Sequence, residues 1–370
     1  MLHRRTVLKS VIAAWGGGLL ASCGSGNSGA PGGSGGSGRW VMPDEGAPHD
    51  RTWMAFAARE DIWGPELAPA VKRNLAAIAV AVAAVEPVSM LVPAEDMDLA
   101  RRLIGGADVE LVTCELDDLW VRDTGPVFVR AAAGAAGVDF NFNGWGRRQR
   151  HRRDREVAGI VTREAGVESL RTDLVLEGGA LEVDGEGTAI ITESCVLNDN
   201  RNRGWSKADV EAELGRLLGI TTVIWLPGIA GMDITDGHTD FYARFASPGV
   251  VVAGLETDET SFDYDVTRVH LDILRAATDA AGRRLQVEVL ESPSSVRAEF
   301  DSPDFAAGYV NFYVCNDAVM VPEFGAVDTD DAARDLLRRL FPGRRVVQLN
   351  IDAIAAGGGG IHCATQQQPA

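Results

Sequence analysis

The chain has few of the residues that build disulfide scaffolds and zinc sites, with five cysteines and six histidines among 370 residues. No Cys-x-x-Cys pair occurs, which excludes a zinc ribbon and a thioredoxin-like redox motif, and five cysteines are too few for a disulfide-rich fold. Basic residues are also scarce, because 35 Lys and Arg face 53 Asp and Glu, for a net charge of −18. This balance argues against nucleic-acid binding and is compatible with a cationic ligand.

Long apolar runs are missing too. The stretch Val11–Ala21 is too short and too rich in glycine to span a bilayer, which takes about 20 apolar residues. The pair Arg4-Arg5 precedes this stretch, and Leu20-Ala21-Ser22-Cys23 lies at its end. Together they resemble a bacterial twin-arginine signal with a lipobox. We therefore expect a signal peptide over residues 1–23, a lipid on Cys23, export by the twin-arginine route, and anchoring at the outer face of the bacterial cytoplasmic membrane.

The rest of the chain is predicted to form one globular domain. Residues 24–38 are rich in glycine and serine and read as a flexible linker. No similar linker occurs within 39–370, and 46% hydrophobic with 24% charged residues is a globular composition with ample material for a core.

Five segments of this domain have the three-and-four spacing of apolar residues that predicts a helix. The first segment follows Pro65 and the third starts at Ser206. The second, fourth and fifth cover about 153–165, 264–281 and 328–341. Short β-rich runs lie between them, among them Leu174–Leu176 and Tyr309–Val314. The rhythm predicts an α/β protein with internal repetition, although an ordinary doubly wound sheet has a similar pattern.

Five polar motifs are distributed among the segments between these helices. They are Trp120–Pro126, Leu176–Gly179, Asp236–Asp240, Tyr309–Tyr313 and Gly357–Pro369.

Cys363 is the candidate nucleophile. A buried apolar role is the commonest alternative for a cysteine, but four glycines precede this one, at Gly357–Gly360. A glycine run is favoured where the backbone must approach another group closely. Core packing is the better interpretation for the cysteines that lie in or beside apolar runs, Cys114, Cys195 and Cys315.

His238 is the candidate general acid and base, with Asp236 and Asp240 two residues away on either side. In an extended segment, residues 238 and 240 point to the same side. A metal site is the alternative, but the histidines lack metal-ligand spacing, so no metal is expected. Asp123 and Glu177 complete a set of three acids, one histidine and one thiol. Such a set suits a planar guanidinium, which carboxylates bind through paired hydrogen bonds while a thiolate attacks its carbon.

The ordered motifs resemble the agmatine deiminase family, within the group that includes Porphyromonas-type peptidylarginine deiminases. The resemblance runs over about 40–370, from Met42-Pro43 to Gln366–Pro369. It implies a five-bladed α/β propeller with its active site on the pseudo-fivefold axis. It also implies hydrolysis of agmatine to N-carbamoylputrescine and ammonia without a metal or organic cofactor.

The resemblance also implies a role for each matching residue. Cys363 becomes the nucleophile that forms a covalent thiouronium intermediate, and His238 the general acid and base. Glu177 orients the histidine and contacts the guanidinium, which Asp123 and Asp240 clamp. Trp120 is expected to contact the substrate, Cys363 to form no disulfide, and a homodimer is compatible with the family.

Alternatives remain open. Phe56-Ala57 replaces a Trp-Pro common in agmatine deiminases, and the basic run Arg147–Arg153 would suit a carboxylate or an acidic peptide. These departures keep peptidylarginine or another guanidino compound as alternative substrates. Two alternative functions belong to other classes of protein: a metal hydrolase, and a non-catalytic lipoprotein that captures guanidino ligands.

Overall fold

The computed structural model describes residues 39–302 and 305–370. The predicted signal (1–23), its lipidated Cys23 and the linker (24–38) lie outside the described residues. Within the described part, no helix combines the length and the apolar composition that crossing a membrane requires.

Five sheets repeat one pattern: an antiparallel pair of strands, a helix, and a third strand parallel to the second. The four central repeats follow one another along the chain. They are β4 (Val127–Ala131), β5 (Gly134–Asp139), α5 (Val157–Glu164), β6 (Glu168–Arg171); β7 (Leu181–Val183), β8 (Thr188–Thr192), α8 (Lys207–Leu218), β9 (Thr222–Leu226); β10 (Ala243–Ser247), β11 (Val250–Leu255), α9 (Tyr264–Ala276), β12 (Gln286–Glu291); and β13 (Tyr313–Val314), β14 (Ala318–Glu323), α10 (Val327–Leu340), β15 (Arg345–Asn350).

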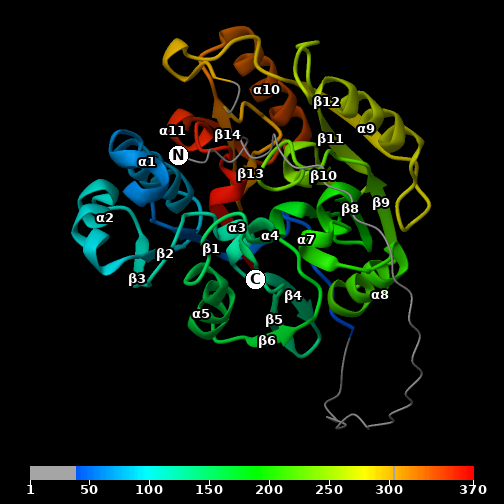
Figure 1. The fold of residues 1–370 in the computed structure, drawn as a ribbon, viewed down its shortest axis with the longest axis horizontal. Helices are drawn as coiled ribbons and strands as arrows, with labels where there is room; N and C mark the ends of the chain where they lie inside the picture. Colours follow the sequence, from blue (N-terminus) through cyan, green and yellow to red (C-terminus); the bar gives the residue numbers. More distant parts are fainter. Residues whose placement is uncertain (1–38, 303–304) are drawn as a thin grey trace, which may run out of the picture.

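The remaining sheet joins the two ends of the domain, because its antiparallel pair combines the last strand with the first. Its order is β16 (Thr365–Pro369), β1 (His49–Ala55), β2 (Val88–Val92) and β3 (Val109–Thr113), with α1 (Glu60–Ala83) and α2 (Met97–Ile104) as connections. Figure 1 shows the sheets around a common centre, with the helices α1, α5, α8, α9 and α10 toward the outside. Five separate sheets exclude a doubly wound sheet and agree with the five-bladed α/β propeller that the resemblance implies.

Short helical turns occupy the connections. They are η1 (Ala94–Asp96), α3 (Val121–Thr124), α4 (Gly144–Arg147), η2 (Asp154–Glu156), η3 (Gly178–Ala180), α6 (Glu193–Val196), α7 (Asp199–Asn202), η4 (Thr239–Phe241), η5 (Ala298–Phe300), α11 (Asp352–Ala355) and η6 (His362–Ala364).

The five predicted helices all form, with shifted ends. At α8 the Ser206 side chain accepts from the backbone of Asp209, whose carboxylate caps Ser206 in return, which confirms the predicted start. The predicted helix over 264–281 ends early at Ala276, because Ala277 is extended and Thr278 pairs with Arg284 as a β-bridge.

The strand predictions are partly wrong. Leu174–Leu176 is no strand, because its backbone bonds elsewhere: Val175 N donates to Asn202 Oδ1 (2.9 Å) and Leu176 N donates to Phe140 O (3.1 Å). Only Tyr313–Val314 of the run 309–314 pairs in a sheet. The residues before it form the irregular segment that carries Asn311.

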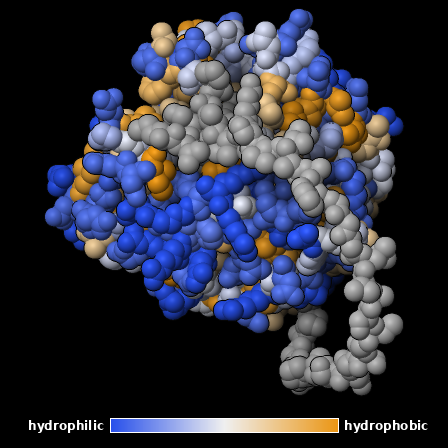
Figure 2. Space-filling model, in the orientation of Figure 1, coloured by the Kyte–Doolittle hydropathy of each residue, from blue (hydrophilic) through white to orange (hydrophobic). Residues whose placement is uncertain are grey.

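The core lies between the helices and the sheets. The inward face of α1 is fully buried at Val71, Leu75, Ile78 and Val82, and α1 also contacts β14 and β15 of the neighbouring sheet. This packing stabilises the junction between the first and last repeats through apolar burial. Hydrophilic residues dominate the face drawn in Figure 2, and hydrophobic residues form small separate groups, of which the most prominent lies at the upper right.

The side chains assigned to chemistry occupy the same place in their repeats, directly before the first strand. Asp123 in α3 precedes β4, Glu177 precedes β7, His238 and Asp240 precede β10, and Cys363 in η6 precedes β16. Because the repeats share one topology, these positions meet at the centre, where α3 contacts η3 and η6, and η3 contacts η4.

Candidate active site

Gly179 marks the point where three motifs converge. A Cβ atom built on it would lie 2.7 Å from His238 Nδ1, 2.8 Å from Asp123 Oδ1 and 3.1 Å from Asp240 Oδ2. All three side chains belong to buried residues. The structure therefore brings the predicted histidine and two predicted acids together over one glycine.

A Gly179→Ala variant is expected to lower kcat/KM at least about 10²-fold, because its methyl group would displace three reacting or binding side chains. Steady-state kinetics with a guanidino substrate measures the loss. Gly159→Ala is the matched control, since a Cβ there meets nothing within 4 Å. Equal activity in the two variants would contradict the convergence over Gly179.

Cys363 lies in η6 with its thiol in contact with two other motifs. Asn311 Nδ2 donates to Cys363 Sγ at 3.3 Å, and Sγ lies 3.5 Å from Asp240 Oδ2. Asn311 Oδ1 also accepts from the backbone N–H of His362 at 3.0 Å. The motif around Asn311 is conspicuous in the sequence, but nothing there assigns the amide this role.

The glycines before Cys363 fit the prediction of close backbone approach. A Cβ at Gly357 would lie 2.1 Å from the Trp63 ring, and one at Gly359 would lie 2.2 Å from the Trp120 ring. Trp120 is fully buried behind this run, stacked on Trp63 at 5.8 Å. The role of Trp120 as a substrate contact stays a prediction, and its position is that of a support for the loop.

His238 and Glu177 form a buried ion pair, with His238 Nε2 3.3 Å from Glu177 Oε2. Burial opposes the charged imidazolium, but Asp123 and Glu177 outweigh it and raise the His238 pKa well above its usual value. Burial also works against the Glu177 carboxylate, but Arg201 and His238 lower its pKa to about 2. Both groups are therefore charged at neutral pH.

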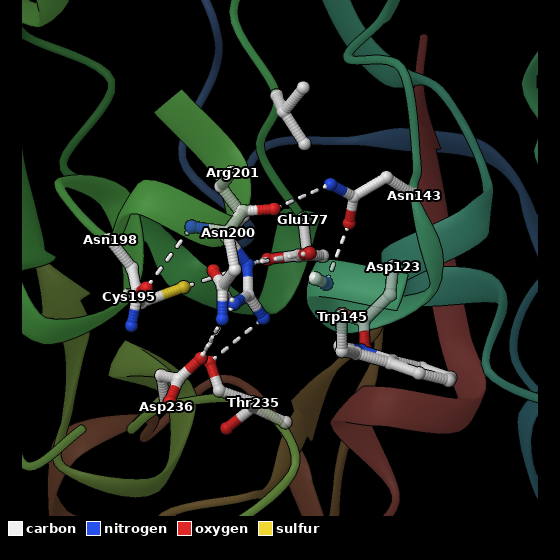
Figure 3. A network of polar contacts seen from close by, with 12 residues as sticks. Asp123, Asn143, Trp145, Glu177, Cys195, Asn198, Asn200, Arg201, Thr235 and Asp236 are labelled. Atoms are coloured by element: carbon white, nitrogen blue, oxygen red, sulfur yellow. Dashed lines mark hydrogen bonds and ion pairs between the residues drawn. The ribbon is translucent and has the colours of Figure 1, made fainter. Parts of the chain in front are cut away.

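Arg201 is the principal partner of Glu177 and is not evident from the sequence. Its Nε donates to both oxygens of Glu177 at 3.0 Å, and its Nη1 donates to Asp236 Oδ2 at 2.7 Å (Figure 3). Asp236 thus holds Arg201 and does not face a ligand beside His238. The segment after His238 is not extended, because residues 239–241 form the turn η4, yet His238 and Asp240 still face one place beside Gly179.

Asp123 is held by groups on two other segments. Trp145 Nε1 donates to its Oδ2 at 2.9 Å, and the backbone N–H of Gly179 donates to Oδ1 at 3.2 Å. Trp145 has φ 52° and ψ 55°, a left-handed conformation that costs energy for a bulky side chain. In this conformation the indole N–H of Trp145 points at the carboxylate of Asp123.

Asp240 binds His362 through one oxygen, with Oδ2 2.8 Å from His362 Nδ1. Burial raises its pKa, but the His362 contact outweighs burial and leaves the pKa below the usual value. Its Oδ1 is buried and has no hydrogen-bond partner among the described residues. A buried carboxylate oxygen without a donor is suited to receive an N–H group from a ligand.

A chamber of about 1000 Å³ opens onto these groups, and Asp123, His238 and Cys363 lie in its wall. Its wall carries seven carboxylates and, among the described lining residues, no arginine or lysine. The acids are Asp123, Asp233, Glu256, Asp258, Asp263, Glu291 and Asp301. Glu177 and Asp240 lie just behind the wall.

The basic run Arg147–Arg153 is not part of the chamber wall. Arg148 pairs with Asp236 at 2.8 Å, and Arg150 pairs with Asp117 at 3.1 Å. Its charges are thus partly neutralised by acids outside the chamber. The run gives no support to the recognition of a substrate carboxylate.

Cys195 is buried, as core packing predicts, but it also touches the site. Its Sγ donates to Glu177 Oε2 at 3.5 Å, and Cys195, Glu177 and His238 are close enough together to hold a metal. Arg201 already neutralises Glu177 there, so the cluster has the character of an ion-pair network. Cys114, Cys195, Cys315 and Cys363 are all buried, and none of them forms a disulfide within the described residues.

Comparison with known proteins agrees with this geometry. The profile of Porphyromonas-type peptidyl-arginine deiminases matches residues 41–369. The agmatine deiminase of Ectopseudomonas mendocina is 40% identical over 353 residues, covering 89% of this chain and 95% of that protein. The agmatine deiminase of Pseudomonas aeruginosa is 38% identical, with the same two coverages.

Solved structures lead to the same family. An agmatine deiminase of Enterococcus faecalis superposes with a TM-score of 0.82 at 32% identity, covering 89% of this chain and 96% of that one. Profile, relatives and fold thus agree over nearly the whole described domain. The chain belongs to the Porphyromonas-type peptidyl-arginine deiminase family.

Proposed function

We propose that this chain is an agmatine deiminase, which hydrolyses the guanidino group of agmatine to a ureido group and releases ammonia. The thiol, imidazole and carboxylates at the centre of the fold supply the groups that this reaction needs. Relatives of 38–40% identity that carry this name support the choice.

The first half of the reaction is covalent. The guanidinium lies between Asp123 and Asp240, and its positive charge favours ionisation of the Cys363 thiol. The thiolate attacks the central carbon and a sulfur–carbon bond forms. His238 gives its proton to one nitrogen, which leaves as ammonia, so a thiouronium remains on Cys363 and His238 becomes neutral.

The second half restores the enzyme. Neutral His238 takes a proton from a water molecule whose oxygen adds to the same carbon. The sulfur–carbon bond breaks, its electrons return to the thiolate, and the ureido product leaves. The second proton of that water goes to the released ammonia, which becomes ammonium, so atoms and charge balance. Glu177 keeps His238 oriented through both steps.

The single observation that favours agmatine over arginine is the charge of the chamber. Agmatine is a dication, whereas free arginine adds a carboxylate that would need a positive partner. The chamber wall offers seven carboxylates and, within the described residues, no lysine or arginine.

Parallel assays of ammonia and ureido product test this choice. Residues 39–370 are given agmatine, free arginine and an arginine-containing peptide. We expect kcat/KM for agmatine to exceed that for arginine at least about 10²-fold, because like charges placed together cost several kcal/mol. Faster turnover of arginine or the peptide would overturn agmatine as the substrate and leave the chemistry intact.

We also propose that the protein is exported and lipid-anchored, on the strength of residues 1–23 alone. A Cys23→Ala variant should lose metabolic labelling with a fatty acid and leave the membrane fraction, and Arg4→Lys with Arg5→Lys should block export. Lipid labelling that survives Cys23→Ala would overturn the anchor.

A further inference from the structure

We propose that Glu45 and His362 form a buried relay that positions Asp240 and the Cys363 loop for deimination. The inference rests on the proposed function and adds two positioning residues to it. Neither residue lines the chamber, and they act through Cys363, which lines it, and through Asp240, which contacts Cys363 from behind the wall.

Glu45 is the hub of this relay. It is 8% exposed and both carboxylate oxygens are engaged. Its Oε1 accepts from Arg244 Nη2 at 2.7 Å and from the backbone N–H of Val314 at 2.8 Å. Its Oε2 accepts from Arg122 Nη2 at 3.0 Å and contacts His362 Nε2 at 2.9 Å. Burial opposes the carboxylate, but the surrounding cations hold its pKa well below the usual value.

The partners of Glu45 belong to the segments that carry the site. Arg122 precedes Asp123, and its Nε donates to the carbonyl of His362 at 3.3 Å. Arg244 Nη1 donates to the carbonyl of Phe312, next to Asn311, at 2.7 Å. One carboxylate thus connects three of the five central motifs.

His362 lies between two carboxylates, because Nε2 faces Glu45 Oε2 and Nδ1 faces Asp240 Oδ2 at 2.8 Å. Each ring nitrogen thus faces one carboxylate oxygen, and the two contacts fix the plane of the His362 ring one residue from the nucleophile.

The contact with His362 restrains the carboxylate of Asp240. Because His362 occupies Oδ2, the carboxylate cannot rotate freely, and Oδ1 remains as the buried oxygen without a partner among the described residues. The same Oδ2 lies 3.5 Å from Cys363 Sγ. Without the charge of Glu45, the contact at His362 Nε2 would weaken, the ring would be held firmly from one side only, and the orientation of Asp240 beside Cys363 would change.

Glu45→Gln tests the relay, because it keeps the shape and removes the charge. We expect kcat to fall about 10- to 100-fold, as for other hydrogen-bond partners of reacting groups, with a small change in KM. Alkylation of Cys363 by iodoacetamide should slow about tenfold, and this readout requires no substrate.

Glu86→Gln is the matched control. Glu86 is also buried and also pairs with a histidine, His49 Nδ1 at 3.0 Å. It is linked to Glu45 only indirectly, because His49 Nε2 lies 2.9 Å from the backbone carbonyl of Glu45 and not from its carboxylate. Its kcat and the alkylation of Cys363 should stay within about threefold of wild type, even where thermal unfolding shows a similar loss of stability. Equal losses of kcat and alkylation rate in the two variants would overturn the relay.

A double variant separates a relay from independent effects. Glu45→Gln and His362→Gln should be non-additive, with the double variant no slower than the worse single variant, because both break one chain of contacts. Additive losses would overturn the proposal. Failure of agmatine turnover in wild type, with the alkylation differences intact, would count against the proposed substrate and not against the relay.

Discussion

Replacing Cys363 by alanine is expected to reduce agmatine turnover at least about 10⁴-fold, because the sulfur that forms the covalent intermediate is lost. None of the other three thiols in the described part of the chain lines the chamber, so none is placed to take over. Cys195 Sγ donates to Glu177, burial raises the Cys195 pKa, and Cys195 does not line the chamber.

Ammonia release measures the loss of turnover, and titration calorimetry measures the agmatine binding that remains. Agmatine should still bind to Cys363→Ala, since the carboxylates that hold the guanidinium are unchanged. Cys114→Ala is the matched control, because this buried cysteine packs in an apolar cluster, bonds to the carbonyl of Glu115 at 3.6 Å and does not line the chamber. A Cys363→Ala enzyme with substantial turnover would refute nucleophilic catalysis, and equal loss in both variants would indicate misfolding.

Replacing His238 by glutamine is expected to lower kcat about 10²- to 10⁴-fold, the usual contribution of a general acid and base. Glutamine can still bond to Glu177 but cannot transfer a proton. The wild-type enzyme needs a protonated His238 at the first step of the reaction. We therefore expect kcat/KM to fall as the pH rises through the His238 pKa.

That alkaline limb should lie well above pH 6.5, because Asp123 and Glu177 outweigh burial in raising the His238 pKa. The free energy of unfolding should depend on pH in the same direction as kcat/KM, falling as the pH rises. A raised histidine pKa contributes stability that is complete below the unfolded value and lost as the pH rises through the folded value. A pH profile of kcat/KM in which the limb persists unchanged in His238→Gln would contradict this assignment.

Much of the fold and the reacting groups could be predicted from local sequence. Helical periodicity located all five repeating helices, and the five motifs contained every side chain assigned to chemistry. The reason for the helices is physical, because a helix is specified by its own apolar spacing. That the motifs meet at one centre followed only from the five-bladed topology that the family resemblance implied.

The supporting groups could not be predicted, because they depend on contacts between distant segments. Glu45 and His362 are 317 positions apart, and Arg201 is identified as the partner of Glu177 only by the folded chain. Trp145 depends on a left-handed backbone conformation that its residue type disfavours. The failed strand at Leu174–Leu176 has the same cause, since its apolar residues are buried without a neighbouring strand.

Rapid mixing of the enzyme with agmatine, followed by acid quench and mass measurement, tests the central claim most directly. The account predicts a transient adduct equal in mass to agmatine less one ammonia, mapped to the peptide that contains Cys363 and absent from Cys363→Ala. Turnover that proceeds with no adduct at any time point, together with an active Cys363→Ala enzyme, would contradict it.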